Sequence, residues 1–125
     1  MLHALLNIAG RDDLLGHPVV GASWEGFVIE NQIDAAPALT VPGFCRTLGG
    51  AEIDLLLELP GGERWASEVK RSRVAKPARG FYEACEDLKP ARRFVVHGGL
   101  DRYPVSADVE AIRLRELTEI LSRLA

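Results

Sequence analysis

The segment from Gly50 to Lys70 constrains the fold more than any other part of the sequence. Two apolar runs, Ala51–Leu59 and Arg64–Arg71, flank a Pro-Gly-Gly turn, which is the pattern of a β-hairpin. The first run carries an acid, Asp54, among apolar residues, and the second contains Glu68-Val69-Lys70. Burying ionisable side chains in strands is costly unless they are paired or bind a metal. We therefore expect a functional site on this hairpin.

The hairpin register decides whether its acids can act together. A strict two-residue turn at Gly61-Gly62 would pair Asp54 with Val69 and turn Glu68 to the other face, because strand side chains alternate. A three-residue turn, or one bulge, would pair Asp54 with Glu68 on one face. Pro60 cannot donate a ladder hydrogen bond, which favours the looser turn. If the acids instead face opposite ways, Glu68 and Lys70 form an ordinary solvated pair of little energetic value.

Length and composition indicate one soluble domain. The chain has 125 residues and a net charge of −3, which argues against a general electrostatic grip on nucleic acid. No apolar run reaches the ~20 residues of a membrane span, and the start lacks the basic region of a secretory signal. Cys45 and Cys85 are in no metal or redox spacing. We expect a cytoplasmic protein with two free thiols and no membrane partner.

The remaining pattern predicts an α/β layer architecture. We divide the chain into an amino-terminal helix and connection, residues 1–21, and one globular domain, residues 22–125. In the domain, Ser23 is an expected N-cap for a helix that Pro37 ends. The other expected elements are a strand at Phe44–Leu48, a helix at Lys76–Leu88, strands at Arg93–His97 and Val109–Leu114, and a closing helix at Arg115–Leu124.

The first helix of this domain, Trp24–Ala36, carries a further acid. At ~100° per residue, Trp24, Phe27 and Val28 form an apolar arc, whereas Glu30 falls in the polar gap. Glu25 falls inside the predicted buried sector, so we expect it to point at the sheet. The competing interpretation is that Glu25, in the first turn, only stabilises the helix dipole.

These residues together resemble the PD-(D/E)xK nuclease superfamily, which has the restriction-endonuclease-like fold. The resemblance runs from about Leu14 to Leu121. Within it the chain looks most like a domain of unknown function at the carboxyl end of bacterial and archaeal AAA-type ATPases. Three stretches carry that likeness: Ser23–Glu30, Gly50–Asp54 and Arg92–Val96. The resemblance implies a three-layer core of a helix, a sheet that starts with three antiparallel strands, a second helix and further strands.

The resemblance also implies a divalent-metal-dependent endonuclease that hydrolyses nucleic-acid phosphodiester bonds. Its catalytic residues would be Glu25, Asp54, Glu68 and Lys70. Mg²⁺ or Mn²⁺ would be held by Asp54, Glu68 and the backbone carbonyl of Val69, with Glu25 acting through water or on a second metal. Lys70 would orient the attacking water and share its charge.

A basic stretch directly follows the expected site. Arg71, Arg73, Lys76 and Arg79 are candidate phosphate contacts, although a solvated loop fits the stretch equally well. The expected partners are nucleic acid, with DNA favoured over RNA, an AAA-type ATPase domain that this sequence lacks, and a second copy in a homodimer. The competing function is a catalytically silent nuclease fold that serves as a binding or regulatory domain of such an ATPase.

Overall fold

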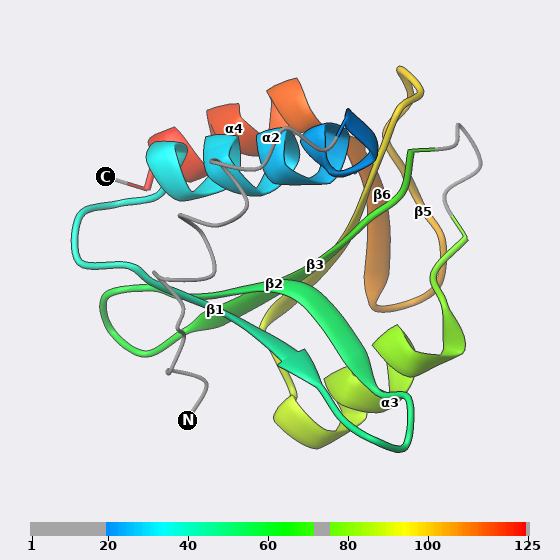
Figure 1. Cartoon of the computed structure of the whole chain (residues 1–125). Coiled ribbons are helices and arrows are strands. Elements are labelled where there is room, and N and C mark those ends of the chain that lie inside the picture. Colours follow the sequence, from blue (N-terminus) through cyan, green and yellow to red (C-terminus); the bar gives the residue numbers. More distant parts are fainter. Residues whose placement is uncertain (1–19, 72–75, 125) are drawn as a thin grey trace.

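The computed structural model describes residues 20–71 and 76–124, which form a mixed α/β structure. A six-stranded sheet runs in the order β1–β2–β3–β4–β6–β5. Helices α2 and α4 cover one face of the sheet and α3 lies on the other, which makes three layers (Figure 1). The elements are α2 (Val20–Ala35), β1 (Val41–Arg46), β2 (Glu52–Glu58), β3 (Arg64–Val69), α3 (Arg79–Leu88), β4 (Arg92–His97), β5 (Tyr103–Pro104), β6 (Val109–Arg113) and α4 (Leu114–Ser122).

The sheet changes direction at β3. Strands β1, β2 and β3 pair antiparallel, whereas β3, β4 and β6 pair parallel. Helix α3 connects the first two parallel strands, as a parallel connection requires. The short β5 closes the far edge antiparallel to β6. In consequence β3 carries an antiparallel neighbour on one side and a parallel neighbour on the other.

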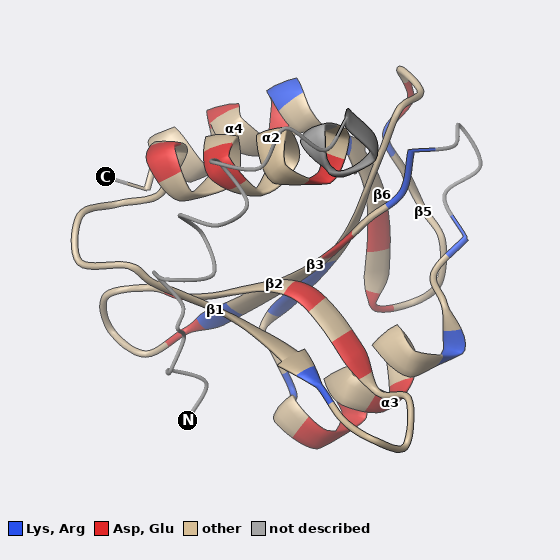
Figure 2. Ribbon diagram, viewed as in Figure 1, with Lys and Arg blue, Asp and Glu red and all other residues tan. Residues whose placement is uncertain are grey.

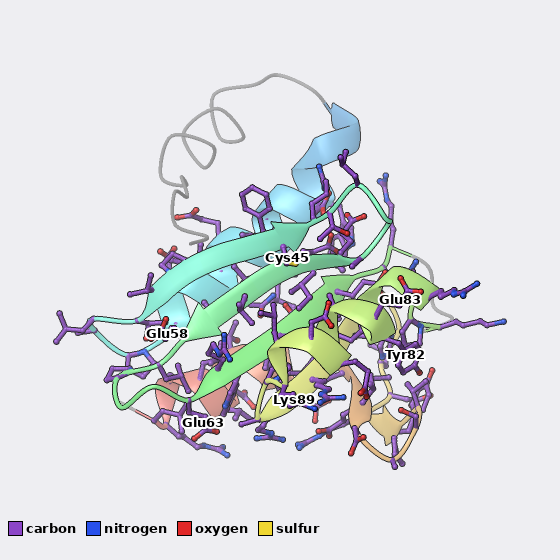
Figure 3. The ribbon with its side chains drawn as sticks, turned by 90° about the horizontal axis from the view of Figure 1, so that it is seen from below. Cys45, Glu58, Glu63, Tyr82, Glu83 and Lys89 are labelled. Carbon is purple, nitrogen blue, oxygen red and sulfur yellow. The ribbon has the colours of Figure 1, made fainter. Side chains whose placement is uncertain are left out.

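Each face of the sheet has its own apolar core. The helix α3 contributes Phe81, Ala84 and Cys85, all at most 1% exposed, to the first. Figure 3 shows α3 lying across the strands on this face. The second core lies under α2 and α4, and its buried members are Val28, Leu55, Leu57, Leu59, Trp65, Phe94, Val96, Ile112, Leu117 and Leu121. Apolar burial on both faces explains the consecutive apolar residues Leu55–Leu57 of β2 and Phe94–Val96 of β4, which alternate between the two cores.

Most predicted elements are confirmed to within about three residues. The predicted strand Phe44–Leu48 is displaced, because β1 spans Val41–Arg46, and α3 begins at Arg79 rather than Lys76. The two-residue β5 was missed, since so short a strand has no periodicity to detect. Both cysteines are free, as expected. The helix predicted at Leu2–Ile8 lies outside the described residues.

The looser hairpin turn is confirmed. Leu59 N–H donates to Glu63 O (2.7 Å), which leaves Pro60, Gly61 and Gly62 as a three-residue turn. Gly61 and Gly62 both have positive φ, near 100°, which glycine adopts without steric cost. The pairs run from Glu58 opposite Arg64 to Leu55 opposite Ser67. The same register brings Asp54 level with Glu68.

Helix α2 requires two corrections. It begins at Val20, so Ser23 lies inside the helix and is not its N-cap; one glycine, Gly21, is too weak a helix breaker to stop it, at about 1 kcal/mol. Phe27, placed in the apolar arc, is 56% exposed, and Glu30, predicted to face solvent, is half-buried. Both errors have one cause. The helix packs on α4 as well as on the sheet, so its buried sector is rotated away from Phe27.

Candidate active site

The sheet forks between β2 and β3 at the level of the predicted site. Their pairing ends at Leu55 and Ser67. Beyond this point β2 stays with β1, where Glu52 lies opposite Arg46, while β3 stays with β4, where Val69 lies opposite Val96. The two arms diverge in Figure 1. Asp54 and Glu68 therefore stand on opposite arms, each at the first position past the end of the pairing.

A β-bulge aims Asp54 into this fork. Between Gly43 and Cys45 of β1, the partner residue on β2 moves three places, from Leu56 to Ile53. The extra residue falls at Asp54 and Leu55, and bulges bend a strand and redirect its side chains. Asp54 Oδ2 accepts a hydrogen bond from Val69 N–H across the fork, at 2.8 Å. The Asp54 carboxylate thus takes the place of the backbone carbonyl that would accept the next hydrogen bond between β2 and β3.

Glu68 is held from two sides on the other arm. Its Oε1 accepts a hydrogen bond from Ala78 N–H (3.0 Å), the residue that caps the start of α3. Its Oε2 lies 3.4 Å from Lys70 Nζ. The Glu68 side chain is 12% exposed and that of Lys70 34%, so the ammonium reaches solvent while the carboxylate is mostly covered. The acid-x-base spacing puts both side chains on one face of β3.

A hollow of about 430 Å³ collects these groups. Its lining brings Glu25 of α2 together with both arms of the fork and the start of α3, and comprises Trp24, Glu25, Gly50, Glu52, Asp54, Glu68, Val69, Lys70, Arg71, Ala78 and Gly80. Four carboxylates face two cations there, which is a net charge of −2. Figure 2 shows acidic positions along the β2 arm and basic positions where β3 ends.

The electrostatics of Asp54 reflect this imbalance. Burial raises its pKa to about 7, and the negative charges of Glu25, Glu52 and Glu68 add to the rise, while the hydrogen bond from Val69 N–H opposes it. Like charges disfavour the ionised form of a buried acid. A cation in the hollow would offset the repulsion among these carboxylates.

The prediction that Glu25 lies on the site side of α2 agrees with the structure, but the prediction that it is buried is wrong. It lines the hollow and its charge acts on Asp54, yet the residue is exposed rather than buried. The reason is that the sheet beneath it is open at the fork. Glu52 was missed. Its position two residues before Asp54 was the available signal, and its carboxylate is paired with Arg46 at 3.1 Å.

The lining offers oxygen donors against which the predicted metal site can be compared. Within residues 20–71 and 76–124, no three His, Cys, Asp or Glu side chains are grouped to hold a metal. The predicted set has two direct carboxylate ligands, Asp54 and Glu68, with the Val69 carbonyl, and Glu25 acts through water. In a strand, the N–H and C=O of one residue point to the same neighbour, so the Val69 carbonyl points into the fork with its N–H. Oxygen donors and a −2 charge fit Mg²⁺ or Mn²⁺.

The basic stretch only partly joins the site. Arg71 lines the hollow, whereas Lys76 and Arg79 are exposed and do not line it, and Arg79 is paired to Glu83 (3.1 Å). Arg73 lies outside the described residues. Arg92 lies at the start of β4, opposite Trp65 of β3, so it is at the other end of the strands from Lys70.

Comparison with known proteins identifies a family. The profile of DUF4143, a domain of unknown function, matches residues 20–117. An uncharacterised protein of Mycobacterium bovis and another of Mycobacterium tuberculosis are each 40% identical over 112 residues, which cover 90% of this chain. The chain spans about a quarter (25%) of the length of these curated relatives. No solved structure matches the chain. No helix in the described ranges is long and apolar enough to cross a bilayer.

Proposed function

The chain belongs to the DUF4143 family, and from the geometry of its fork we propose that it is a divalent-metal-dependent endonuclease-like domain that hydrolyses nucleic-acid phosphodiester bonds. One observation carries the proposal: Asp54 and Glu68 line one hollow from the two sides of a break in the sheet, with Lys70 Nζ 3.4 Å from Glu68 Oε2. This arrangement supports a restriction-endonuclease-like core, as the sequence resemblance implies.

Each residue has a separate task in this proposal. Asp54, Glu68 and the Val69 carbonyl would hold Mg²⁺ or Mn²⁺. When bound, the cation supplies Lewis-acid chemistry, which neutralises charge on the phosphate and acidifies a nearby water. Lys70 stabilises the negative charge that develops at the phosphorus, and Glu25 holds a water at the mouth of the hollow. The N–H of Ala78 fixes the Glu68 carboxylate, so α3 positions that ligand.

The test is cleavage of plasmid, single-stranded, branched and RNA substrates in Mn²⁺. Glu68→Ala and Lys70→Ala proteins run alongside. The matched control is Glu58→Gln, because Glu58 is an exposed acid of the same strand as Asp54 at the turn end of the hairpin (Figure 3). Cleavage that survives in Glu58→Gln and disappears in both site variants supports the proposal. No cleavage by the folded wild-type chain contradicts it.

A second function has its own support. The net charge of −3 is unfavourable for holding DNA, and the chain spans about a quarter (25%) of its relatives. Both facts favour a silent nuclease fold that regulates a larger protein, with an AAA-type ATPase as the partner implied by the resemblance. A Mn²⁺ titration tests the catalytic function. If no Mn²⁺ binding that depends on Asp54 and Glu68 is found, the catalytic function is excluded.

A further inference from the structure

The turn that follows β4 is built around a buried histidine, His97, which is the last residue of that strand and 2% exposed. Both of its ring nitrogens bond the backbone of the turn. Gly99 N–H donates to Nδ1 at 2.8 Å, and Nε2 lies 2.8 Å from the carbonyl oxygen of Asp101. Because a carbonyl only accepts and an N–H only donates, the imidazole is neutral and carries its proton on Nε2.

A buried histidine with both nitrogens satisfied is often only a core residue, but this turn packs against the end of β3 (Figure 1). A Cβ built on Gly98 would lie 2.7 Å from the carbonyl oxygen of Arg71, closer than real Cβ atoms come. One residue earlier, Lys70 N–H donates to Val96 O at 2.8 Å. The two residues that flank His97 therefore contact residues 70 and 71.

These contacts reach only one arm of the fork. Lys70 and Arg71 are the two cations that line the hollow there. Strand β4 pairs with β3 and β6, whereas Asp54 and Glu52 belong to β2 on the other arm. A change in the turn after β4 should therefore act on the cations of the hollow before it acts on the carboxylates of β2.

We propose that His97 is a positioning residue for the fork, whose imidazole holds residues 98–101 in the shape that places Lys70 and Arg71 at the hollow. The inference rests on the proposed function for the role of these cations. An apolar ring cannot replace the imidazole, because it would leave Gly99 N–H and Asp101 C=O without their partner. A displaced turn moves Gly98, and the close approach of Gly98 transmits that movement to the end of β3.

The experiment is ¹H–¹⁵N NMR of the full chain at pH 7.5, as wild type, His97→Phe and His97→Asn. Phenylalanine fills the space of the ring without its hydrogen bonds, and should shift the amide signals of Lys70 and Arg71. Hydrogen exchange of the Lys70 amide should speed up about tenfold, since its bond to Val96 opens more easily. Asparagine should recover most of the wild-type signals, because its Oδ1 accepts from the N–H two residues on.

Val109→Ala is the matched control for a general loss of stability. Val109 is 2% exposed in the core under α3. It lies at the other end of the strands, where it lines a second hollow, of about 430 Å³, together with residues that include Arg92, Arg93, Asp108 and Glu110. The substitution leaves a cavity and lowers the free energy of unfolding, but should not move the signals of residues 70 and 71.

The ring ¹⁵N signals of the wild type test the hydrogen bonding without any variant. They should show His97 Nε2 protonated and Nδ1 unprotonated. The proposal is overturned if the ring has the other tautomer or is charged, or if His97→Phe leaves Lys70 and Arg71 in place. It is also overturned if Val109→Ala moves them as far as His97→Phe does, or if His97→Asn does.

Cleavage separates failure of this inference from failure of the proposed function. In saturating Mn²⁺, His97→Phe should lower the single-turnover rate about tenfold or more, because a small misplacement of a reacting group is costly. Mn²⁺ affinity should stay within a few-fold, and His97→Asn should recover most of the rate. Unchanged cleavage by His97→Phe, with Glu68→Ala inactive, overturns the inference alone. No cleavage by the folded wild type contradicts the proposed function, and the amide signals still decide whether His97 positions Lys70 and Arg71.

Discussion

The two ends of β3 and β4 carry hollows of equal volume, about 430 Å³ each, and only the hollow at the fork has a net charge in its lining. At the fork, four carboxylates meet two cations, and the repulsion contributes to a pKa of about 7 at Asp54. At the other end, the hydrogen bond to Glu110 raises the pKa of Arg102, because an opposite charge favours the ionised form. Charge is compensated at one end and left uncompensated at the other. The uncompensated end is where a ligand of opposite charge gains most from binding.

The largest expected effect is on catalysis at the fork. Lys70→Met should lower Mn²⁺-dependent cleavage about 10²- to 10³-fold, the usual loss for one group that stabilises transition-state charge. Mn²⁺ affinity should stay within a few-fold, since the ligands remain. Single-turnover cleavage and Mn²⁺ titration measure the two quantities. Equal cleavage by Lys70→Met and wild type would remove Lys70 from the mechanism.

The next effect concerns the pH dependence of stability. Asp54 has its pKa raised in the folded state from 3.8 to about 7, so its contribution is fully present below about pH 4 and is lost as the pH rises through 7. Asp54→Asn should therefore match wild type near pH 4 and exceed it by roughly 3–4 kcal/mol at pH 8 in a chelator. Urea unfolding at both pH values tests this. If Asp54→Asn is less stable than wild type at pH 8, ionisation of the buried Asp54 carboxylate does not destabilise the folded state.

A bound Mn²⁺ should offset the free-energy cost of ionising Asp54 in the folded state. Mn²⁺ at 100-fold its Kd adds about 2.7 kcal/mol, or roughly 10 °C in Tm for a domain of this size. The shift should vanish in Asp54→Asn and Glu68→Gln. It should persist in Glu110→Gln, which removes a carboxylate from the other hollow, even though that variant starts from a lower Tm. Differential scanning calorimetry with and without Mn²⁺ measures the change in Tm. A change lost equally in all three variants would contradict site-specific binding.

Much of this arrangement could be predicted from the sequence, and the failures share a physical origin. The apolar runs gave the strands, and the Pro60-Gly61-Gly62 turn gave a register that puts Asp54 level with Glu68. The bulge at Asp54 was not foreseen, because it depends on pairing with β1, a strand whose position was itself misplaced. The exposure of Phe27 and the role of Glu52 depend likewise on contacts between distant segments. Local pattern carries no information about them.

A smaller effect should follow from crowding at the start of α3. A Cβ at Gly80 would lie 2.0 Å from the carbonyl oxygen of Gly50, so Gly80→Ala must push α3 away from the β1–β2 turn. We expect a loss of about 1–3 kcal/mol and weaker Mn²⁺ binding, because Ala78 N–H then leaves Glu68. Gly49→Ala is the control, since its nearest contact is an ordinary 3.9 Å. Thermal unfolding measures both, and equal stability of the two variants would contradict the close approach.

The smallest effect belongs to the compensated end. Glu110→Gln removes the charge shared by Arg92 and Arg102, whose side chains are 35% and 40% exposed. Partly exposed pairs contribute about 0.5–1 kcal/mol, and Arg92 keeps its stacking on Trp65 and Phe94. Urea unfolding should show this loss at low salt and less of it at 1 M NaCl, because salt screens exposed pairs. The sign is the informative part. At pH 8, removing a carboxylate should destabilise the chain at Glu110 and stabilise it at Asp54, and equal signs at the two sites would abolish the distinction between the two hollows.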